Sequence, residues 1–378
     1  MELNLATLQA YLRRRGTAIG VFEPHTEFHI DEIGDGNLNT VYRVSDATHS
    51  ERSLVLKHAP PYIKILGPDY PLSTKRLTYE SRALDVYNRL MRRAVPVQYS
   101  FDPDMAVIAM EDLRDARVLR DDLIAGRVDI AISEQVGRFM AVVHSQTYVD
   151  NLDSETAQHH KQQFANTTMQ SITADYVFTL PYTEHETNFW TPGLACDVQQ
   201  LKMDVDFLQW AAHLKQVFLT TQQGVTHGDL HTGSVLVQDD TAKVIDAEFA
   251  FYGPVGFDLG LYWANYLLSY FSHQGVLNVQ SALKAAVVQT WYTYSAEFKM
   301  VNAELKTRIL QNIFHEAVGF AGLEMLRRLI GAAHVKDIEG IADISRKLHV
   351  ERAALQFGTV LVKQHRSIHD VAAVIALL

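Results

Sequence analysis

The chain has 378 residues, a length that suggests two domains. Hydrophobic residues make up 47% and charged residues 21%, which is typical of a soluble globular protein and excludes disordered, collagen-like and coiled-coil chains. The formal net charge of −10 disfavours nucleic acid or an anionic membrane as the main partner, because an acidic surface repels phosphate groups. Cys196 is the only cysteine, which excludes an intrachain disulfide or a thiolate zinc site and favours a reducing compartment, the cytoplasm.

The first third of the chain has the patterns of a β-rich region. Short runs of alternating apolar and polar residues are separated by turn-forming residues, and one longer helical pattern interrupts them before Pro96. The expected elements are an amphipathic helix over 1–16, strands over 27–33, 40–46 and 53–58, a helix over 73–95, and strands over 97–102 and 105–110.

Beyond about residue 115 the periodicity becomes helical, and alternation returns only around 235–248. Strands followed by helices, without βαβ alternation, predict an α+β fold with two lobes, residues 1–112 and 113–378. The expected helices cover 133–146, 205–220, 259–271, 281–299, 303–331 and 337–348.

The most informative stretch is THGDLHTGSVLVQDDTAKVIDAEFAFYGPVGFDLG, residues 226–260. Val235–Gln238 and Lys243–Asp246 are strand-like segments of equal length joined by a polar turn, so the chain returns to its start and Asp246 is expected near the loop that carries Asp229. Glu248 points the same way as Asp246 if the segment is extended. Converging carboxylates repel one another unless a cation binds, and oxygen ligands favour Mg²⁺.

Two other interpretations stay open on these residues alone. His227, Asp229 and His231 would suit the zinc cluster of a metal hydrolase, although an H-x-H pair and a fourth ligand are missing. Alternatively, the acids are solvated turn residues, which fits Asp239 and Asp240 better than Asp229.

The same stretch resembles the catalytic and metal-binding segments of the protein kinase-like superfamily, and within it the aminoglycoside phosphotransferase and choline kinase branch. The strings HGDLHTGS (227–234) and VIDAEFAFYGPVGFD (244–258) are most similar to the methylthioribose kinase family, which usually has proline where this chain has Ala247. Further matching segments extend the resemblance over most of the chain, at 34–44, 54–67, 123–127 and 315–331.

This resemblance implies a protein kinase-like fold, with a small β-rich lobe and a larger helical lobe. It implies an ATP- and Mg²⁺-dependent homodimer that phosphorylates the 1-hydroxyl of 5-methylthioribose, a small sugar, in methionine salvage. One alternative is a related kinase for an aminoglycoside, choline or another sugar. The other is an inactive nucleotide-binding homologue, against which the presence of Lys57, Asp229 and Asp246 together argues.

The resemblance also assigns roles around the acceptor and the metal. Asp229 would orient the acceptor hydroxyl and accept its proton, while Asp246 and Glu248 would hold Mg²⁺. Arginines suit the sugar and the transferring phosphate, because the guanidinium fork matches phosphate geometry. Substrate contacts are expected from Asp229, Arg327 and Arg328, and support for the catalytic loop from His227, Ser234 and Asp258.

At the nucleotide, Lys57 would contact the α- and β-phosphates and pair with a glutamate. The best candidate is Glu80 on the following helix, with Glu32 and Glu51 as alternatives. The turn at 34–39 would cover the phosphates, and the segment 110–113 would be the hinge that binds adenine. The residues expected at the ATP site are Lys57, Glu80, Gly34, Gly36, Asn37, Asn39, Glu111 and Leu113.

Overall fold

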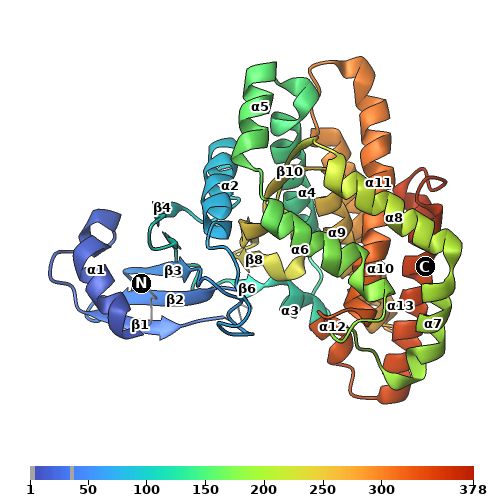
Figure 1. Ribbon diagram of the computed structural model, residues 1–378, viewed down its shortest axis with the longest axis horizontal. Helices are drawn as coiled ribbons and strands as arrows, with labels where there is room; N and C mark the ends of the chain where they lie inside the picture. Colours follow the sequence, from blue (N-terminus) through green and yellow to red (C-terminus); the bar gives the residue numbers. More distant parts are fainter. Residues whose placement is uncertain (1–4, 35–37) are drawn as a thin grey trace. The chain divides into compact units, whose positions relative to one another are not determined.

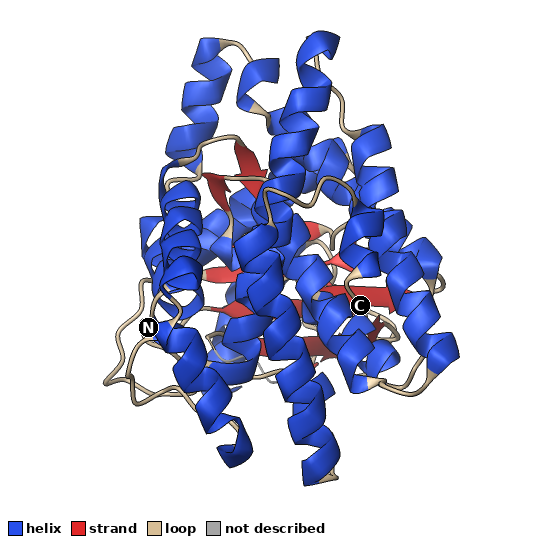
Figure 2. Ribbon diagram, turned by 90° about the vertical axis from the view of Figure 1, so that its right-hand side faces the viewer, coloured by secondary structure: helices blue, strands red, loops and turns tan. Residues whose placement is uncertain are grey.

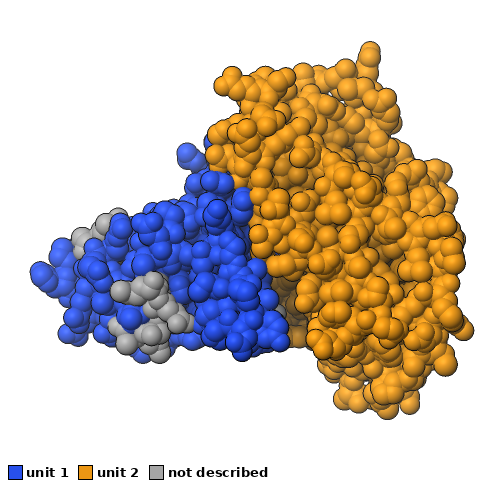
Figure 3. Space-filling view, in the orientation of Figure 1, with its two compact units in different colours: residues 1–115, 245–249 blue, residues 116–244, 250–378 orange. Residues whose placement is uncertain are grey.

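The computed structural model describes residues 5–34 and 38–378, coloured along the sequence in Figure 1. The chain forms two compact units, which are coloured separately in Figure 3. The residues of unit 1 are Met1–Asp115 and Ile245–Phe249, and those of unit 2 are Ala116–Val244 and Ala250–Leu378.

The division differs from the expected lobes in two respects. The first unit extends to Asp115 and not to residue 112, and Ile245–Phe249, expected in the second lobe, groups with unit 1. The reason is that η5 (Ala247–Phe249) packs against α2 (Arg76–Leu90). Asp246 and Glu248 therefore belong to the same unit as Lys57.

Unit 1 is built on a sheet of five strands in the order β1-β2-β3-β5-β4, in which every neighbouring pair is antiparallel. The strands lie close to the ranges expected from alternation, which is clearest where Tyr42, Val44, Leu54 and Leu56 are buried between more exposed neighbours. They are β1 (Phe28–Glu32), β2 (Thr40–Asp46), β3 (Ser53–His58), β4 (Gln98–Asp102) and β5 (Val107–Glu111).

Helix α1 (Leu5–Ile19) packs on one face of this sheet (Figure 1). Leu8 of the helix lies in one buried cluster with Leu54 and Leu56 of β3. Successive side chains of a strand point to opposite faces, so Lys57 points to the other face. On that side α2 packs against β4 and β5.

Unit 2 is predominantly helical (Figure 2). Its central helix, α9 (Gly256–Ser272), is almost wholly buried. Close packing with α11 requires Gly260, because a Cβ there would lie 2.8 Å from the carbonyl oxygen of Ala317. The other helices are α3 (Leu119–Ile124), α4 (Ile130–Thr147), α5 (Ser154–Gln163), α6 (Thr167–Phe178), α7 (Ala195–Met203), α8 (Val205–Thr220), α10 (Leu277–Glu297), α11 (Ala303–Ile330), α12 (Lys336–Glu339), α13 (Ile344–Gln364) and α14 (Val371–Ala376).

Two small sheets complete unit 2. The hairpin that follows the Asp229 loop has a shorter turn than expected. Asp239 and Asp240 both have positive φ, as a two-residue type I′ turn requires. The returning strand therefore begins at Thr241 and ends at Val244, before Asp246. The sheets consist of β6 (Arg117–Val118), β8 (Val235–Gln238) and β9 (Thr241–Val244), and of β7 (Gly224–Thr226) and β10 (Phe251–Gly253).

The helix expected over 337–348 is wrong in its extent. The chain leaves α12 at Gly340 and starts α13 at Ile344, where the side chain of Asp343 accepts a hydrogen bond from the backbone N–H of Arg346. Apart from such differences, the sheet of unit 1 and the helices of unit 2 confirm the predicted α+β, two-lobed class. Within residues 5–34 and 38–378, no helix combines the length and the apolar character that crossing a membrane requires.

Candidate active site

In unit 1, the structure brings Lys57 together with two of the predicted carboxylates. Its ammonium Nζ lies 2.7 Å from Oε2 of Glu80 on α2 and is also bonded to Asp246. The alternative partner Glu32 pairs with Lys64 instead. Burial lowers the pKa of Lys57, but the nearby carboxylates outweigh it and hold that pKa above the ordinary value. The lysine is therefore a fixed positive charge.

Glu248 is buried beside this pair and is held by residues outside its own segment. Asn39 donates from Nδ2 to its Oε2 at 2.7 Å, and Nε of Arg76 lies 3.4 Å from the same oxygen. Arg76 in turn donates from Nε to Oδ1 of Asn39 at 2.9 Å. The amide of Asn39 thus contacts both Glu248 and Arg76, and its contact with the ATP phosphates stays a prediction.

Arg76 is a site residue that the sequence analysis missed. It is fully buried, and its guanidinium donates to the backbone carbonyls of Leu38, Pro60 and Ser73. One signal was available, because Arg76 lies four residues before Glu80 and so shares its helix face.

Asp246 and Glu248 offer the donor set that the metal prediction requires. The Asp246 side chain is 48% exposed. Burial and the neighbouring carboxylates raise the pKa of Glu248 to about 7, against the opposing effects of Lys57 and Asn39. Two oxygen ligands under mutual repulsion suit a hard cation such as Mg²⁺, which takes its remaining ligands from water and phosphates. Among the residues that the structure describes, no group of three or more His, Cys, Asp or Glu forms a metal cluster.

In unit 2, Asp229 lies in the loop after β7, with its side chain 27% exposed. Nη2 of Arg327 lies 3.8 Å from one carboxylate oxygen, and Nε2 of His231 lies 3.6 Å from the other. Burial raises the pKa of Asp229, while Arg327 and Arg328 oppose that shift. The carboxylate is thus accessible and flanked by donors.

The loop that carries Asp229 is fixed by hydrogen bonds to its backbone. Asp258 accepts from the N–H groups of His227 and Gly228, at 2.7 and 2.9 Å, and His144 lies 3.1 Å from the same carboxylate. Ser234 donates to the carbonyl of Asp229 at 3.1 Å.

The other expected support, His227, places Nδ1 3.3 Å from the N–H of Asp229. The expected supports of the catalytic loop all contact its backbone. Asp258 stands in the first turn of α9, whose N-cap is Val255.

The Arg327–Arg328 pair is anchored by a buried acid that the sequence analysis also missed. Nε of Arg327 lies 2.6 Å, and Nε of Arg328 2.7 Å, from the carboxylate of Glu324. Burial raises the pKa of Glu324, but the two guanidinium groups lower it below its ordinary value. The spacings i+3 and i+4 were the available signal. Both arginines are largely buried on α11, so they are not an exposed pair on a helix face.

The remaining predicted ATP contacts lie in unit 1. Gly34 has a φ of +77°, and a Cβ there would meet nothing within 4 Å. Gly36 and Asn37 lie outside the described residues. Glu111 accepts a hydrogen bond from a backbone N–H at 3.1 Å, and Leu113 is buried. The closeness expected for Asp229 and Asp246 stays a prediction.

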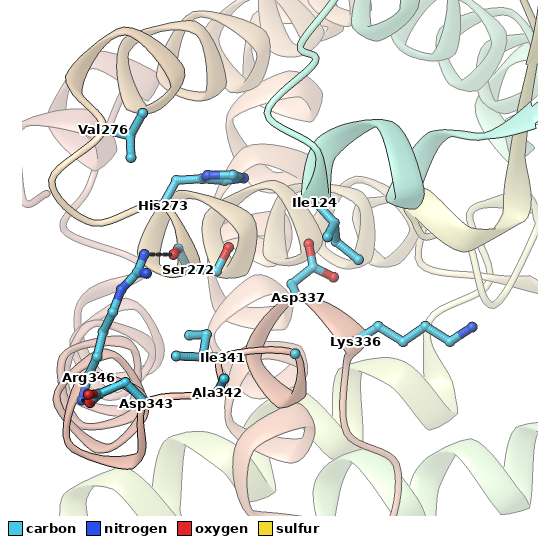
Figure 4. A pocket seen from close by; sticks show the side chains of 11 residues that line it. Ile124, Ser272, His273, Val276, Lys336, Asp337, Ile341, Ala342, Asp343 and Arg346 are labelled. Carbon is cyan, nitrogen blue, oxygen red and sulfur yellow. Dashed lines mark hydrogen bonds between the residues drawn. The ribbon is translucent and has the colours of Figure 1, made fainter.

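A separate pocket of about 460 Å³ lies in unit 2 beside the C-terminal end of α9, α12 and the start of α13 (Figure 4). Asp337, His273 and Arg346 are among its lining residues, and none of the predicted site residues lines it. The pocket is therefore distinct from the Asp229 loop.

Comparison with protein families and curated proteins gives one consistent result. Residues 29–291 match the family described as Phosphotransferase enzyme family. The chain is 39% identical over 363 residues to a methylthioribose kinase of Bacillus mycoides (strain KBAB4), covering 93% of this chain and 91% of that protein. It is 38% identical over 361 residues to a methylthioribose kinase of Geobacillus sp. (strain WCH70), covering 93% and 90%.

Among solved structures, a glucosamine kinase (crystal form B) has a similar fold. The TM-score is 0.50 at 11% sequence identity, over 90% of this chain and 82% of that chain. At this identity the likeness concerns the fold alone.

Proposed function

The chain belongs to the methylthioribose kinase family of phosphotransferases, and from this premise we propose that it transfers the γ-phosphoryl group of ATP to the 1-hydroxyl of 5-methylthioribose. The products are ADP and 5-methylthioribose 1-phosphate, which the cell uses in methionine salvage. The observation that carries the proposal is the accessible Asp229 carboxylate flanked by Arg327.

At the acceptor, Asp229 orients the sugar hydroxyl and accepts its proton as the new P–O bond forms. A raised pKa makes this carboxylate a better base than an ordinary aspartate. Arg327 and Arg328, anchored by Glu324, bind the sugar and the charge that develops on the phosphoryl group. Because Glu324 fixes both guanidinium groups, little reorganisation is needed during transfer.

At the nucleotide, Lys57 binds the α- and β-phosphates and Glu80 keeps it in place. Asp246 and Glu248 would hold Mg²⁺, and that ion neutralises phosphate charge when bound. Asn39 and Arg76 hold Glu248 in position. Protein kinases have a metal-binding asparagine in the catalytic loop, five residues after the catalytic aspartate, where this chain has Ser234, and Glu248 takes over that role. Lys57 exchanges its bond to Asp246 for the phosphates when the nucleotide binds.

We place the reaction in the cytoplasm, where ATP is abundant and a single exposed thiol stays reduced. We also infer a homodimer from the family. Light scattering on the purified protein tests this inference, and a monomer at micromolar concentration would contradict it.

The test of the function is ADP release by the purified chain with Mg²⁺ and one acceptor at a time: 5-methylthioribose, choline or kanamycin. We expect turnover with 5-methylthioribose that requires Mg²⁺, and a ³¹P signal of a sugar 1-phosphate. The variant Asp229→Asn is the matched control. Turnover of choline or kanamycin without turnover of 5-methylthioribose would leave only the wider phosphotransferase family.

A further inference from the structure

The proposed reaction leaves His231 without a role, although its ring faces the catalytic carboxylate. His231 is the N-cap of the short helix η4 (Thr232–Ser234), and its Nδ1 accepts a hydrogen bond from the backbone N–H of Gly233 at 3.0 Å. The side chain is 15% exposed, and Nε2 lies 3.6 Å from Oδ2 of Asp229. The two nitrogens of the ring therefore face different partners.

A guanidinium on another helix shares the Nδ1 side of this ring. Nη2 of Arg120, on α3, lies 3.1 Å from Nδ1 of His231. A guanidinium and a backbone amide only donate hydrogen bonds, so Nδ1 acts as the acceptor and carries no proton. In a neutral imidazole the proton then resides on Nε2, the nitrogen that faces Asp229.

The charged surroundings keep the ring neutral. Burial lowers the pKa of His231 well below its ordinary value, and cations from three directions lower it further. Asp229 is the carboxylate in contact with the ring. The cationic or titratable groups that act on His231 are Arg120 of α3, Arg327 and Arg328 of α11, and His227 of the same loop.

The contact between Arg120 and the ring is closely packed. A Cβ on Gly233 would lie 2.8 Å from both Nη2 of Arg120 and Cε1 of His231, so a larger residue there would displace at least one of the two groups. Nη2 of Arg120 also lies 3.4 Å from Oδ1 of Asn265 on α9. Asn265 is itself bonded to the backbone of its helix at 3.0 Å, which fixes the direction of the guanidinium.

We propose that Arg120 is a positioning residue, which acts through the Nε2–H tautomer of His231 to hold the Asp229 carboxylate for proton acceptance. The Nε2–Oδ2 separation of 3.6 Å exceeds hydrogen-bond length, and such contacts commonly shorten when the substrate binds. The kinetic consequence rests on the proposed function, whereas the tautomer of His231 does not depend on it.

The tautomer is tested by ¹⁵N NMR of the full chain with labelled histidine, in which His231→Asn identifies the His231 signals. In the wild-type protein we expect a neutral ring with the proton on Nε2 between pH 6 and 8. In Arg120→Met we expect the ring to take up a second proton at a higher pH than in the wild type, because one cation is lost. A wild-type ring protonated on Nδ1 would overturn the proposal, even if 5-methylthioribose is not phosphorylated.

The kinetic test uses two variants that each keep half of the imidazole. His231→Gln keeps an N–H near the Nε2 position, whereas His231→Asn keeps an acceptor near the Nδ1 position. We expect kcat to fall by ~10- to 10²-fold in His231→Asn and in Arg120→Met, and to fall less in His231→Gln. The KM for MgATP should stay within about twofold of the wild-type value in all three variants.

Arg138→Met is the matched control, because Arg138 is an exposed arginine of α4 paired with Glu134. It should keep wild-type kcat. A wild-type kcat in Arg120→Met, or equal losses in the two His231 variants with lowered melting temperatures, would mean that the contact serves structure alone and would overturn the proposal. Absence of wild-type turnover with 5-methylthioribose is a different result, since it contradicts the proposed function and leaves the NMR measurement to decide the tautomer.

Discussion

The charged clusters of the two units differ in the balance between their cations and their carboxylates. In unit 1, three carboxylates contact or neighbour two cations, Lys57 and Arg76. The excess is negative, and it adds to burial, which is the main reason that the pKa of Glu248 is raised. The carboxylates of this cluster are Glu80, Asp246 and Glu248.

In unit 2 the charges balance. Arg120, Arg327 and Arg328 neighbour the Asp229 loop and the buried acids Glu324 and Asp337, so three cations meet three carboxylates. A surplus of carboxylates suits a divalent cation, whereas guanidinium groups held in place by buried acids suit phosphate and sugar oxygens. We therefore propose that the cluster of unit 1 binds the metal and that the cluster of unit 2 binds the transferred group, within a chain whose overall charge is negative.

The largest expected effect is that of Asp229→Asn. The substitution keeps the shape of the side chain and removes the proton acceptor, so kcat should fall by ~10²–10⁴-fold. The affinity for MgATP, measured by calorimetry, should change little, because Asp229 belongs to the cluster that binds the transferred group. Loss of MgATP binding in this variant would break the division between the two clusters.

The counterpart in unit 1 is Asp246→Asn, which removes one charge from the carboxylate surplus. We expect the affinity for MgATP to fall by about 10²-fold. Loss of a residue that only orients a metal ligand already lowers metal affinity by about 10- to 10²-fold, and loss of the ligand itself should cost at least as much. Binding of ATP without Mg²⁺ should fall less, because Lys57 is then released from Asp246. Equal losses with and without Mg²⁺ would show that Asp246 is not a metal ligand.

A smaller effect is expected when the guanidinium beside Asp229 is replaced. Arg327→Met should lower kcat by on the order of 10²-fold, the usual loss when one donor to a developing oxyanion is removed. Arg327→Lys keeps the charge but not the fork, and should recover part of that loss. Unchanged kcat in both variants, measured with saturating 5-methylthioribose, would leave Arg328 as the only arginine of the pair in contact with the transferred group.

How far the sequence predicted these clusters depends on the separation of the residues involved. The pairing of Lys57 with Glu80 followed from a strand, the next helix and a family motif. The contact between Asn39 and Glu248 joins residues 209 positions apart, and that between Arg120 and His231 joins residues 111 apart. No local pattern encodes such pairs, because folding alone brings them together.

The secondary structure was likewise predictable only where a local pattern is visible. The strands of unit 1 were predictable because short apolar runs are bounded by turn residues, and because the period of two is visible in β2 and β3. Helix α5 was not, since Ala157 is its only buried residue and no apolar period exists. The loop between α12 and α13 was missed because the helical pattern continues through Gly340, while the Asp343 cap starts a new helix.

The smallest expected effects concern stability. They compare two buried glutamates of α11, Glu324, which contacts two arginines, and Glu316, which bonds Gln223. Glu324 bonds two guanidinium groups, which lower its pKa, whereas burial raises the pKa of Glu316 to about 7 against the opposing effects of Gln223 and Arg366.

A lowered pKa contributes stability above the unfolded value near 4.5, so Glu324→Gln should lower the melting temperature at pH 7 to 8. A raised pKa means that the folded protein binds the extra proton, so wild-type stability falls as pH rises from about 4.5 through about 7. Glu316→Gln cannot ionise, and it should melt above the wild type at pH 8 and close to it at pH 5.

Thermal melts of both variants at these two pH values measure the difference. A melting temperature of Glu316→Gln below that of the wild type at pH 8 would show that its carboxylate has a stabilising partner, and that burial does not decide its charge state.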